Sequence, residues 1–251
     1  MKHYKLGRKP KSGHDKLPKF ENFLSAKYGS EAPPLPPIPS AIDWGGKITN
    51  WGMMENDQVG DCVLAAIGHA DMVYTSNAST LITPSDDDIL GAYSDITGYV
   101  YGNKDTDHGT NLVEAMNYWQ SKGLGGRKIV SYVAANPDNI EHVKAAIALF
   151  GSIIVGVDLP DDAEATFEAG NPWTNAANRN YEGGHGMEAH GYDENFIYLT
   201  TWGRVQRATW GWMLAFCNET LVPISADWFN AVGYSPNGFN MAQLMADQAA
   251  L

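Results

Sequence analysis

The chain has 251 residues, of which 44% are hydrophobic and 11% aromatic, enough for one large or two modest domains with a buried core. Residues 1–30 carry eight Lys or Arg against two acids, a net of +6, and the whole-chain charge of −12 therefore leaves −18 on the rest. An acidic body argues against nucleic-acid binding, which needs clustered cations, and no apolar run approaches the ~20 residues of a membrane span.

The first residues are polar throughout and lack the apolar centre of a secretory signal. The two cysteines, Cys62 and Cys217, are too few and too far apart in sequence for a disulfide framework. These features predict a cytoplasmic location. Release by lysis, or packaging into a larger particle, would leave no signal in the sequence either.

The N-terminal residues form a basic, proline-rich arm. Residues 1–31 are predicted to be weakly ordered and solvated, although their charge would also suit a partner protein or the acidic body. The stretch Glu31–Trp44 should run extended over the surface as a strap anchored by Trp44. We therefore assign residues 1–43 to this arm and residues 44–251 to the folded domain.

The stretch Asn56–His69 joins a polar turn to an apolar run with helical spacing. Its apolar residues recur at steps of three and four, which predicts a core helix from Cys62 to about Thr75, with Asp61 or Gly60 as N-cap. At a helix N-terminus a thiol is favoured as its thiolate, and the free backbone N–H groups there can hold an oxyanion. A buried cysteine that simply packs is the alternative for this residue taken alone.

Three further helices are predicted between residues 83 and 151. One follows a cap at Ser85 with acids in its first turn, one is capped by Thr110 and stopped by Gly123, and one opens at Asn136 and closes at Gly151. After that helix the hydrophobic period changes from 3.6 to two, which predicts strands.

Helices first and strands later describe an α+β fold of two lobes. We predict a helical lobe over about residues 52–126, a β lobe over about 127–235 and a C-terminal helix over 239–251. The predicted strands, with a long loop at residues 160–184 and an ambiguous apolar segment Trp210–Phe216, are Lys128–Val133, Ser152–Leu159, His185–Tyr192, Phe196–Thr201 and Leu221–Ile224.

The segments His185–Tyr192 and Phe196–Gly203 together resemble the histidine strand and the Asn-Ser-Trp-Gly strand of papain-like cysteine peptidases. In that family a histidine opens one strand, Gly-Tyr closes it, and the next strand ends in Trp-Gly. Gly109–Gly123 and Val143–Val155 are similar to intervening family segments and follow in the same order. The resemblance covers roughly residues 44–203 and is that of a divergent member of bacterial or phage type.

The resemblance implies a papain-like two-lobe fold and a thiol hydrolase that cleaves peptide or amide bonds in the cleft between the lobes. Cys62 would form an acyl-enzyme while His185 shuttles the proton. The family's oxyanion glutamine lies six residues before its cysteine, where this chain has Asn56; Gln58 has the family side chain at a shorter spacing. Thr200 stands where the family has its asparagine, and its hydroxyl can accept one hydrogen bond from the histidine.

Other readings remain open. The threonine and the oxyanion spacing also fit a weakly active or inactive papain-fold protein that binds a partner or serves as a structural part of a particle such as a virion. An acyltransferase or transglutaminase-type enzyme shares a Cys/His core. No cofactor is expected. No metal is expected either, because His185 and His190 are five apart on one strand and point to opposite faces; a metal held by Cys62, His185 and a carboxylate is the alternative. The arm is interpreted as a surface strap rather than an inhibitory propeptide.

Overall fold

The structure of the protein, a computed structural model, describes residues 4–25, 38–174 and 180–238. The predicted C-terminal helix and the first half of the proline-rich stretch, residues 31–37, lie outside the described residues. Within them, no helix has both the length and the apolar character needed to cross a lipid bilayer.

The helical half is built from α2 (Cys62–Ala78), α3 (Asp86–Thr97) and α4 (Leu112–Ser121). Helix α2 begins at Cys62 with Asp61 as its N-cap, as predicted. A capping box of Ser85 and Asp88 starts α3. Helix α4 is capped by Asn111 rather than by the predicted Thr110, because the Asn111 side chain accepts the N–H of Glu114.

The other half is one antiparallel sheet, in the strand order β2-β7-β3-β4-β5-β6. A short strand β1 (Ile42–Asp43) pairs with β4 outside this path. The strands of the main path are β2 (Ile129–Ala135), β3 (Ile153–Pro160), β4 (Tyr181–Tyr192), β5 (Phe196–Thr201), β6 (Arg204–Thr209) and β7 (Cys217–Ser225).

In the second half one prediction needs correction, one strand was not predicted, and one ambiguous segment is resolved. The loop expected at residues 160–184 contains α6 (Ala163–Glu168) and the first residues of β4. Those residues, Tyr181–Gly184, are polar and glycine-rich and become a strand because they pair with β3. Strand β6 was not expected, since one of its inward-facing residues is the polar Gln206. The ambiguous segment is a helix, α7 (Trp210–Phe216).

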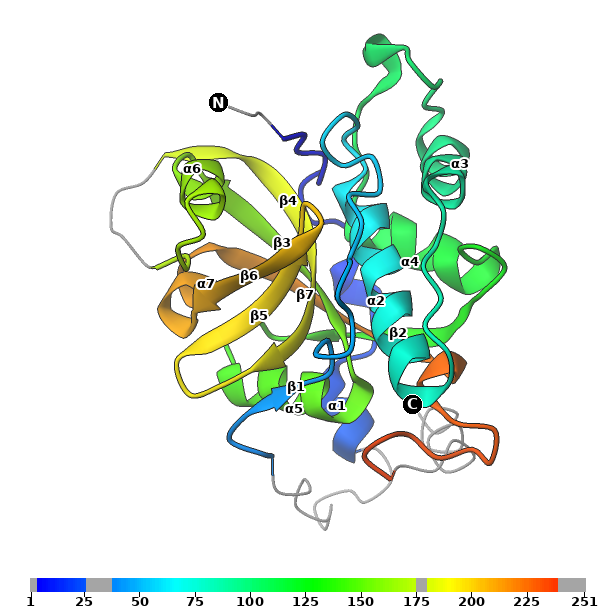
Figure 1. The fold of residues 1–251 in the computed structure, drawn as a ribbon, viewed down its shortest axis with the longest axis vertical. Coiled ribbons are helices and arrows are strands. Elements are labelled where there is room, and N and C mark those ends of the chain that lie inside the picture. Colours follow the sequence, from blue (N-terminus) through cyan, green and yellow to red (C-terminus); the bar gives the residue numbers. More distant parts are fainter. Residues whose placement is uncertain (1–3, 26–37, 175–179, 239–251) are drawn as a thin grey trace.

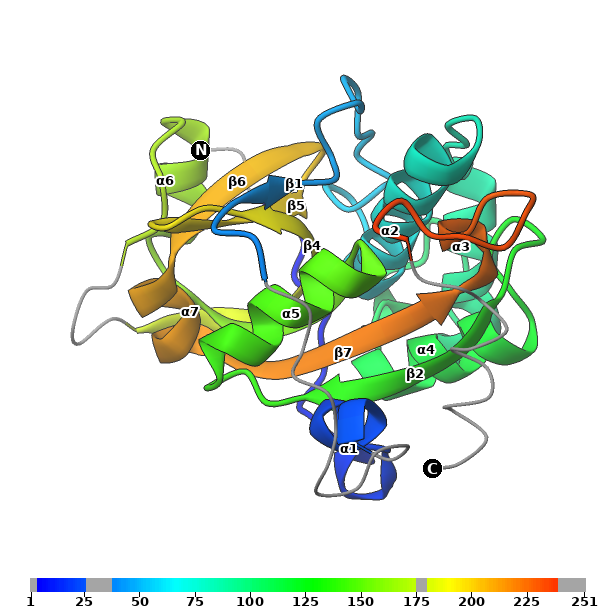
Figure 2. The same ribbon diagram turned by 90° about the horizontal axis from the view of Figure 1, so that it is seen from below.

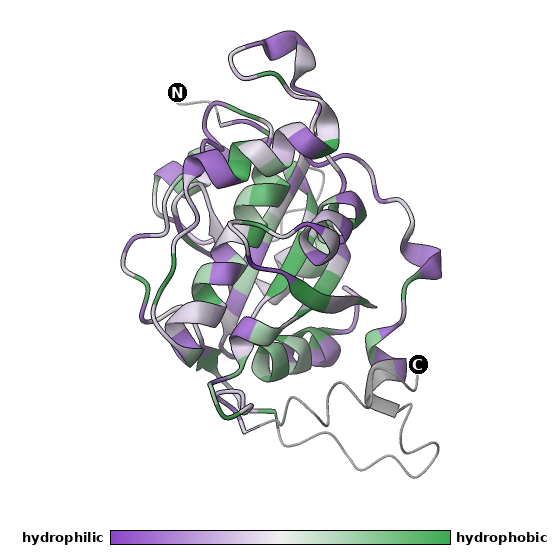
Figure 3. Ribbon diagram, turned by 90° about the vertical axis from the view of Figure 1, so that its right-hand side faces the viewer, coloured by the Kyte–Doolittle hydropathy of each residue, from purple (hydrophilic) through white to green (hydrophobic). Residues whose placement is uncertain are grey.

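Helix α2 lies against one face of the sheet, mainly over β4, and α5 (Ile140–Phe150) covers the other face (Figures 1 and 2). Alternate residues of β3 separate two cores. Ile154 packs among the helices, whereas Ile153 and Val155 pack with α5 and the remaining strands. In Figure 3 hydrophobic residues concentrate at the centre of the molecule and hydrophilic residues at its outlying loops.

Candidate functional site

The first turn of α2 and the middle of β4 meet at Cys62. The Cys62 Sγ accepts a hydrogen bond from the Gly186 N–H at 3.4 Å. A Cβ at Gly186 would lie 2.9 Å from Val63 Cγ2 and 3.2 Å from Val63 Cα. Glycine at position 186 therefore permits the close approach that brings the thiol beside the strand bearing His185.

His185 is fully buried on β4 opposite Val157 of β3. Its Nε2 hydrogen-bonds Thr201 Oγ1 at 2.7 Å, and its ring stacks on Trp202 with centroids 4.8 Å apart. Its Nδ1 makes no hydrogen bond to any described residue. Because Nε2 is occupied, Nδ1 is the ring nitrogen left to exchange a proton with a neighbouring thiol.

The structure places Thr201, and not the predicted Thr200, against His185. Adjacent residues of a strand point to opposite faces, and Thr200 Oγ1 lies 3.3 Å from Nδ1 of His190 instead. His190 also contacts the buried Glu188, at 2.9 Å. Thr200 therefore belongs to a second buried polar cluster, behind the strand that carries the site.

The two candidate oxyanion amides lie in different surroundings. Asn56 is buried, and its Nδ2 lies 3.3 Å from the carbonyl oxygens of Lys5 and Val59. Gln58 is exposed and its amide donates to Asp57. Asn56 Nδ2 also lies 3.3 Å from Asp61 Oδ1, and of the two amides it is the one that donates to the backbone carbonyl of Lys5.

That carbonyl belongs to the N-terminal segment, residues 4–9. The sequence predicted a solvated arm here, but the segment lies in the cleft between the helices and the sheet (Figure 1). On the helical side Gly7 O accepts the Thr110 N–H at 2.9 Å, and the Lys9 N–H donates to Thr110 O at 2.9 Å. On the β side the Arg8 N–H donates to Gly184 O at 3.1 Å, immediately before His185. The segment therefore bridges both walls of the cleft directly over the site.

Burial of the Cys62 thiol and the His185 imidazole favours the neutral form of both groups. Cys62 is 1% exposed, and burial raises the pKa of its thiol to about 11, against the lowering effect of the Gly186 and Gly7 N–H groups. Burial, with a smaller contribution from the Arg8 charge, lowers the pKa of His185 to about 3. Both groups are therefore neutral at pH 7 in this conformation.

Once the N-terminal segment is displaced, valine substitutions at Thr201 and Thr200 should have different effects on the reactivity of Cys62. Thr201→Val removes the hydrogen bond that orients the His185 ring, so the rate of Cys62 alkylation at pH 6 should fall about tenfold. Thr200→Val should leave that rate unchanged and lower only the stability, because its partner is His190. Iodoacetamide alkylation resolved by peptide mass measures both; a larger effect from Thr200→Val would restore the original assignment.

The remaining candidates lie apart from this site. Cys217 is buried, and its Sγ donates to Glu219 O at 3.4 Å, as expected of a packed structural thiol. No group of three His, Cys, Asp or Glu side chains within residues 4–25, 38–174 and 180–238 is placed to hold a metal ion.

Sequence reasoning missed Thr201 and the cleft segment. Thr201 follows from strand alternation only when the register of β5 against β4 is known, and that register shifts between Ala189 and Gly191. Two features of the sequence could have indicated that the segment docks on the body. Gly7 lies within a basic run, and the rest of the chain has a net charge of −18 that attracts it.

Solved structures of cysteine proteases have the same architecture. Xylellain, a cysteine protease from Xylella fastidiosa, superposes with a TM-score of 0.67 at 14% identity, covering 90% of this chain and 99% of its own. The Carica candamarcensis cysteine protease CMS1MS2 in complex with E-64 gives 0.52 at 17% identity, covering 75% and 99%. Bromelain from Ananas comosus, in complex with the E64 inhibitor, gives 0.52 at 15% identity, covering 75% and 100%.

No protein-family model and no curated protein sequence matches this chain. The structural likeness nevertheless covers 75–90% of this chain in these three comparisons. The chain therefore has the papain-like fold of the cysteine proteases.

Proposed function

We propose that the protein is a thiol hydrolase that cleaves peptide bonds through Cys62 and His185. The observation that carries the proposal is the meeting of the two segments. The Cys62 Sγ accepts the N–H of Gly186, the residue after His185, and the His185 ring is held at Nε2 by Thr201 with Nδ1 unbound. A nucleophile beside a base that a third group orients is the arrangement that thiol acyl transfer needs.

In the proposed reaction His185 Nδ1 takes the Cys62 proton, and the thiolate attacks the carbonyl carbon of the substrate. The oxyanion is held by the Cys62 backbone N–H at the start of α2 and by the Asn56 amide. His185 then gives its proton to the leaving amine as the C–N bond breaks. Water, deprotonated by His185, attacks the acyl-enzyme and releases the acid and the free thiol.

The described conformation is a closed form of this enzyme. Residues 4–9 form hydrogen bonds with both walls of the cleft, and the Cys62 and His185 side chains are almost fully buried. A peptide substrate therefore reaches the thiol only after the segment has left. Tyr4 stacks on Trp202 with centroids 4.4 Å apart, so the segment also covers the tryptophan that packs on His185.

The inhibitor E-64, an epoxide that alkylates thiols, tests the proposal. It should label Cys62 in the wild type slowly, at the rate at which the segment undocks, and should label Cys217 not at all. Cys62→Ser should take no label. Peptide mass spectrometry identifies the labelled residue, and the absence of label on Cys62 in a chain whose segment has been displaced contradicts the proposal.

A second candidate is a non-catalytic papain-fold protein that binds a partner or forms part of a larger particle. The neutral, buried state of Cys62 and His185 favours it, because a binding protein needs no thiolate. The two functions separate in the same experiment. An inert Cys62 in the opened chain supports the binding function, whereas a labelled one supports the hydrolase.

A further inference from the structure

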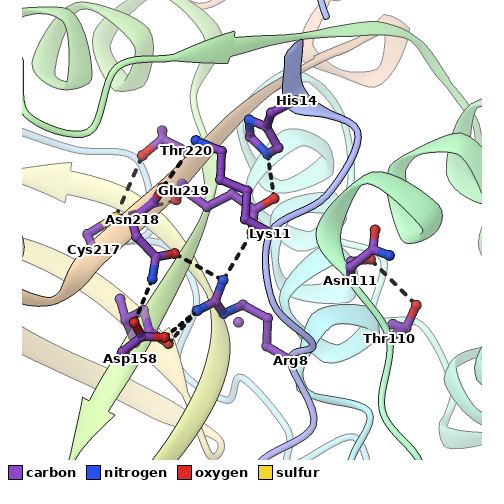
Figure 4. Close-up of polar contacts among 12 residues, drawn as sticks. Arg8, Lys11, His14, Thr110, Asn111, Asp158, Cys217, Asn218, Glu219 and Thr220 are labelled. Carbon is purple, nitrogen blue, oxygen red and sulfur yellow. Dashed lines mark hydrogen bonds and ion pairs between the residues drawn. The ribbon is translucent and has the colours of Figure 1, made fainter. Parts of the chain in front are cut away.

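The Arg8 side chain extends from the N-terminal segment into a pocket in the β half of the molecule, formed by Asp158, Asn218 and Glu219. Its backbone N–H pairs with Gly184 O, the peptide group next to His185, so Arg8 sits where a bound peptide would lie. The side chain is only 2% exposed. Figure 4 shows its guanidinium directed between β3 and β7, toward Asp158, Asn218 and Glu219.

Every polar partner of this guanidinium is an acceptor. One terminal nitrogen, Nη1, lies 3.0 Å from Asn218 Oδ1 and 3.1 Å from Glu219 Oε2. The other, Nη2, lies 2.8 Å from Asp158 Oδ1 and 3.2 Å from Val157 O. The four acceptors are shared by two nitrogens in one plane, which matches the planar fork of an arginine and not the single nitrogen of a lysine.

A β-bulge shapes this pocket. Gly156 pairs with Glu219 and Val157 pairs with Cys217, so Asn218 is an extra residue on β7. The bulge allows the consecutive side chains of Asn218 and Glu219 to reach the same nitrogen. Asn218 also donates to Asp158 Oδ2 at 2.8 Å, which fixes the second carboxylate.

Glycine at position 156 gives the pocket its room. A Cβ there would lie 2.9 Å from Arg8 Cδ, 3.0 Å from Arg8 Nη1 and 3.0 Å from Glu219 Oε2. The pocket wall is therefore fitted to an arginine stem as well as to its head group.

The charge of the pocket requires a cation. Glu219 is fully buried, and its two oxygens are taken by Arg8 and by Nε2 of His14, both from the N-terminal residues. A buried carboxylate without a cation is strongly unfavourable. When residues 4–9 leave, Glu219 keeps its contact with His14, but Glu219 and Asp158 both lose the Arg8 guanidinium, and the occupant that restores those contacts is another guanidinium.

We propose that this pocket is an arginine-selecting subsite of the cleft, and that the preferred substrates carry an arginine side chain at the place now held by Arg8. Glu219 is then the main determinant of this selectivity, with Asp158 and Asn218 completing the fork. The inference rests on the proposed hydrolase function for its meaning as a substrate subsite, but the pocket can be tested by binding alone.

The test uses the full-length Arg8→Ala chain, in which the pocket is vacated. Isothermal titration with N-acetyl-L-arginine amide and with N-acetyl-L-citrulline amide compares a cation with a neutral group of the same shape. We expect arginine to bind at least ~30-fold more tightly, because the fully buried carboxylate of Glu219 and the half-exposed carboxylate of Asp158 both accept from it. In the Arg8→Ala, Glu219→Gln chain that ratio should fall below about threefold. Equal affinities, or a ratio that survives Glu219→Gln, overturn the proposal.

If circular dichroism finds Arg8→Ala unfolded, the wild type supplies the measurement. An excess of the arginine amide should compete with Arg8 and accelerate hydrogen exchange at the Arg8 and Lys9 amides, and the citrulline amide should not. Equal exchange with both probes overturns the proposal.

The subsite and the hydrolase function can fail separately. If Cys62 takes the E-64 label but arginine binds no better than citrulline, the subsite is wrong and the hydrolase stands. If arginine binds selectively while Cys62 stays inert, the hydrolase is wrong and the pocket stands as a guanidinium site. In an active chain, paired peptides that differ only in arginine or citrulline at this position should differ in kcat/KM by the same factor as in binding.

Discussion

Gly7→Ala is expected to open the site and raise the alkylation rate of Cys62 at pH 7 by two orders of magnitude or more. A Cβ on Gly7 would lie 1.7 Å from Gly60 O and 2.3 Å from Gly60 C, a collision with backbone that no rotamer relieves. The substituted segment cannot keep its place, and water reaches the thiol. If the pKa of Cys62 falls from about 11 to the free-thiol value of ~8.5, the thiolate fraction at pH 7 rises roughly 300-fold.

The change is on the segment and leaves the walls of the cleft unaltered. Gly109 and Gly184 make equally close contacts, with their added Cβ atoms 2.0 Å from Gly7 O and 2.2 Å from Arg8 O. Substituting them would also affect any substrate, so Gly7 is the cleaner position. Lys9→Ala, at an exposed residue of the same segment, is the matched control and should leave the rate unchanged.

Iodoacetamide kinetics resolved by peptide mass measure the effect, with Cys217 as internal reference. Hydrogen exchange at Arg8 and Lys9 should accelerate in parallel, because their amides donate to the cleft walls. A folded Gly7→Ala chain with wild-type exchange and wild-type reactivity would show that the segment does not close the site.

The parts of the site that could be predicted from sequence are those set by local pattern. Helix α2 and its start at Cys62 follow from apolar spacing and a polar turn, and the strand of His185 follows from an alternating run that ends in Gly-Tyr. The two-lobe α+β architecture follows from the order of these elements. Local pattern is sufficient here because each element buries its own apolar face.

The parts that could not be predicted depend on register and on distant charges. The choice between Thr200 and Thr201 rests on a shift in the β4–β5 pairing, and a one-residue difference turns a side chain to the other face. The place of Arg8 rests on Glu219 and Asp158, more than 140 residues away in sequence, which meet only when β3 and β7 pair. A basic segment read alone indicates a solvated arm, since its partners are assembled by the fold.

The position of the N-terminal segment and the position of the Arg8 side chain are connected. The N-terminal residues bring to the site the charge that the body lacks, and the bulge between β3 and β7 decides where that charge is received. The same arrangement that closes the cleft therefore indicates which side chain the open cleft would accept.

His185→Ala in the Gly7→Ala chain is expected to abolish the low-pH reactivity of Cys62. In the closed form the pKa of His185 is lowered to about 3 by burial and by Arg8, so it carries no charge to stabilise a thiolate. Once the segment leaves, water and the loss of the Arg8 charge let that pKa rise toward ~6.5, and an imidazolium can hold the thiolate. Without the imidazole the thiol titrates near ~8.5, so alkylation at pH 6 should fall at least ~100-fold.

The control is His142→Ala, since His142 lies at the start of α5 near Glu21 and should leave the profile unchanged. Hydrolysis, where the opened chain shows it, should fall ~10²–10⁴-fold in kcat with His185→Ala, because both proton transfers are lost. Alkylation of the opened chain that rises with a single step near ~8.5, with or without His185, would mean that no ion pair forms. The chain would then be a papain-fold binding protein.

The closed wild type makes the complementary prediction for stability. Because the pKa of His185 is about 3 when folded and ~6.5 when unfolded, the folded state binds fewer protons between these values. Its contribution to the unfolding free energy is present above ~6.5 and is lost as the pH falls toward 3, by up to ~1.4 kcal/mol per pH unit. Urea titrations across this range should show the slope in the wild type and a shallower one in His185→Ala. If the unfolding free energy of both chains depends on pH equally, other groups cause the acid sensitivity, and the pKa of His185 is the same in the folded and the unfolded chain.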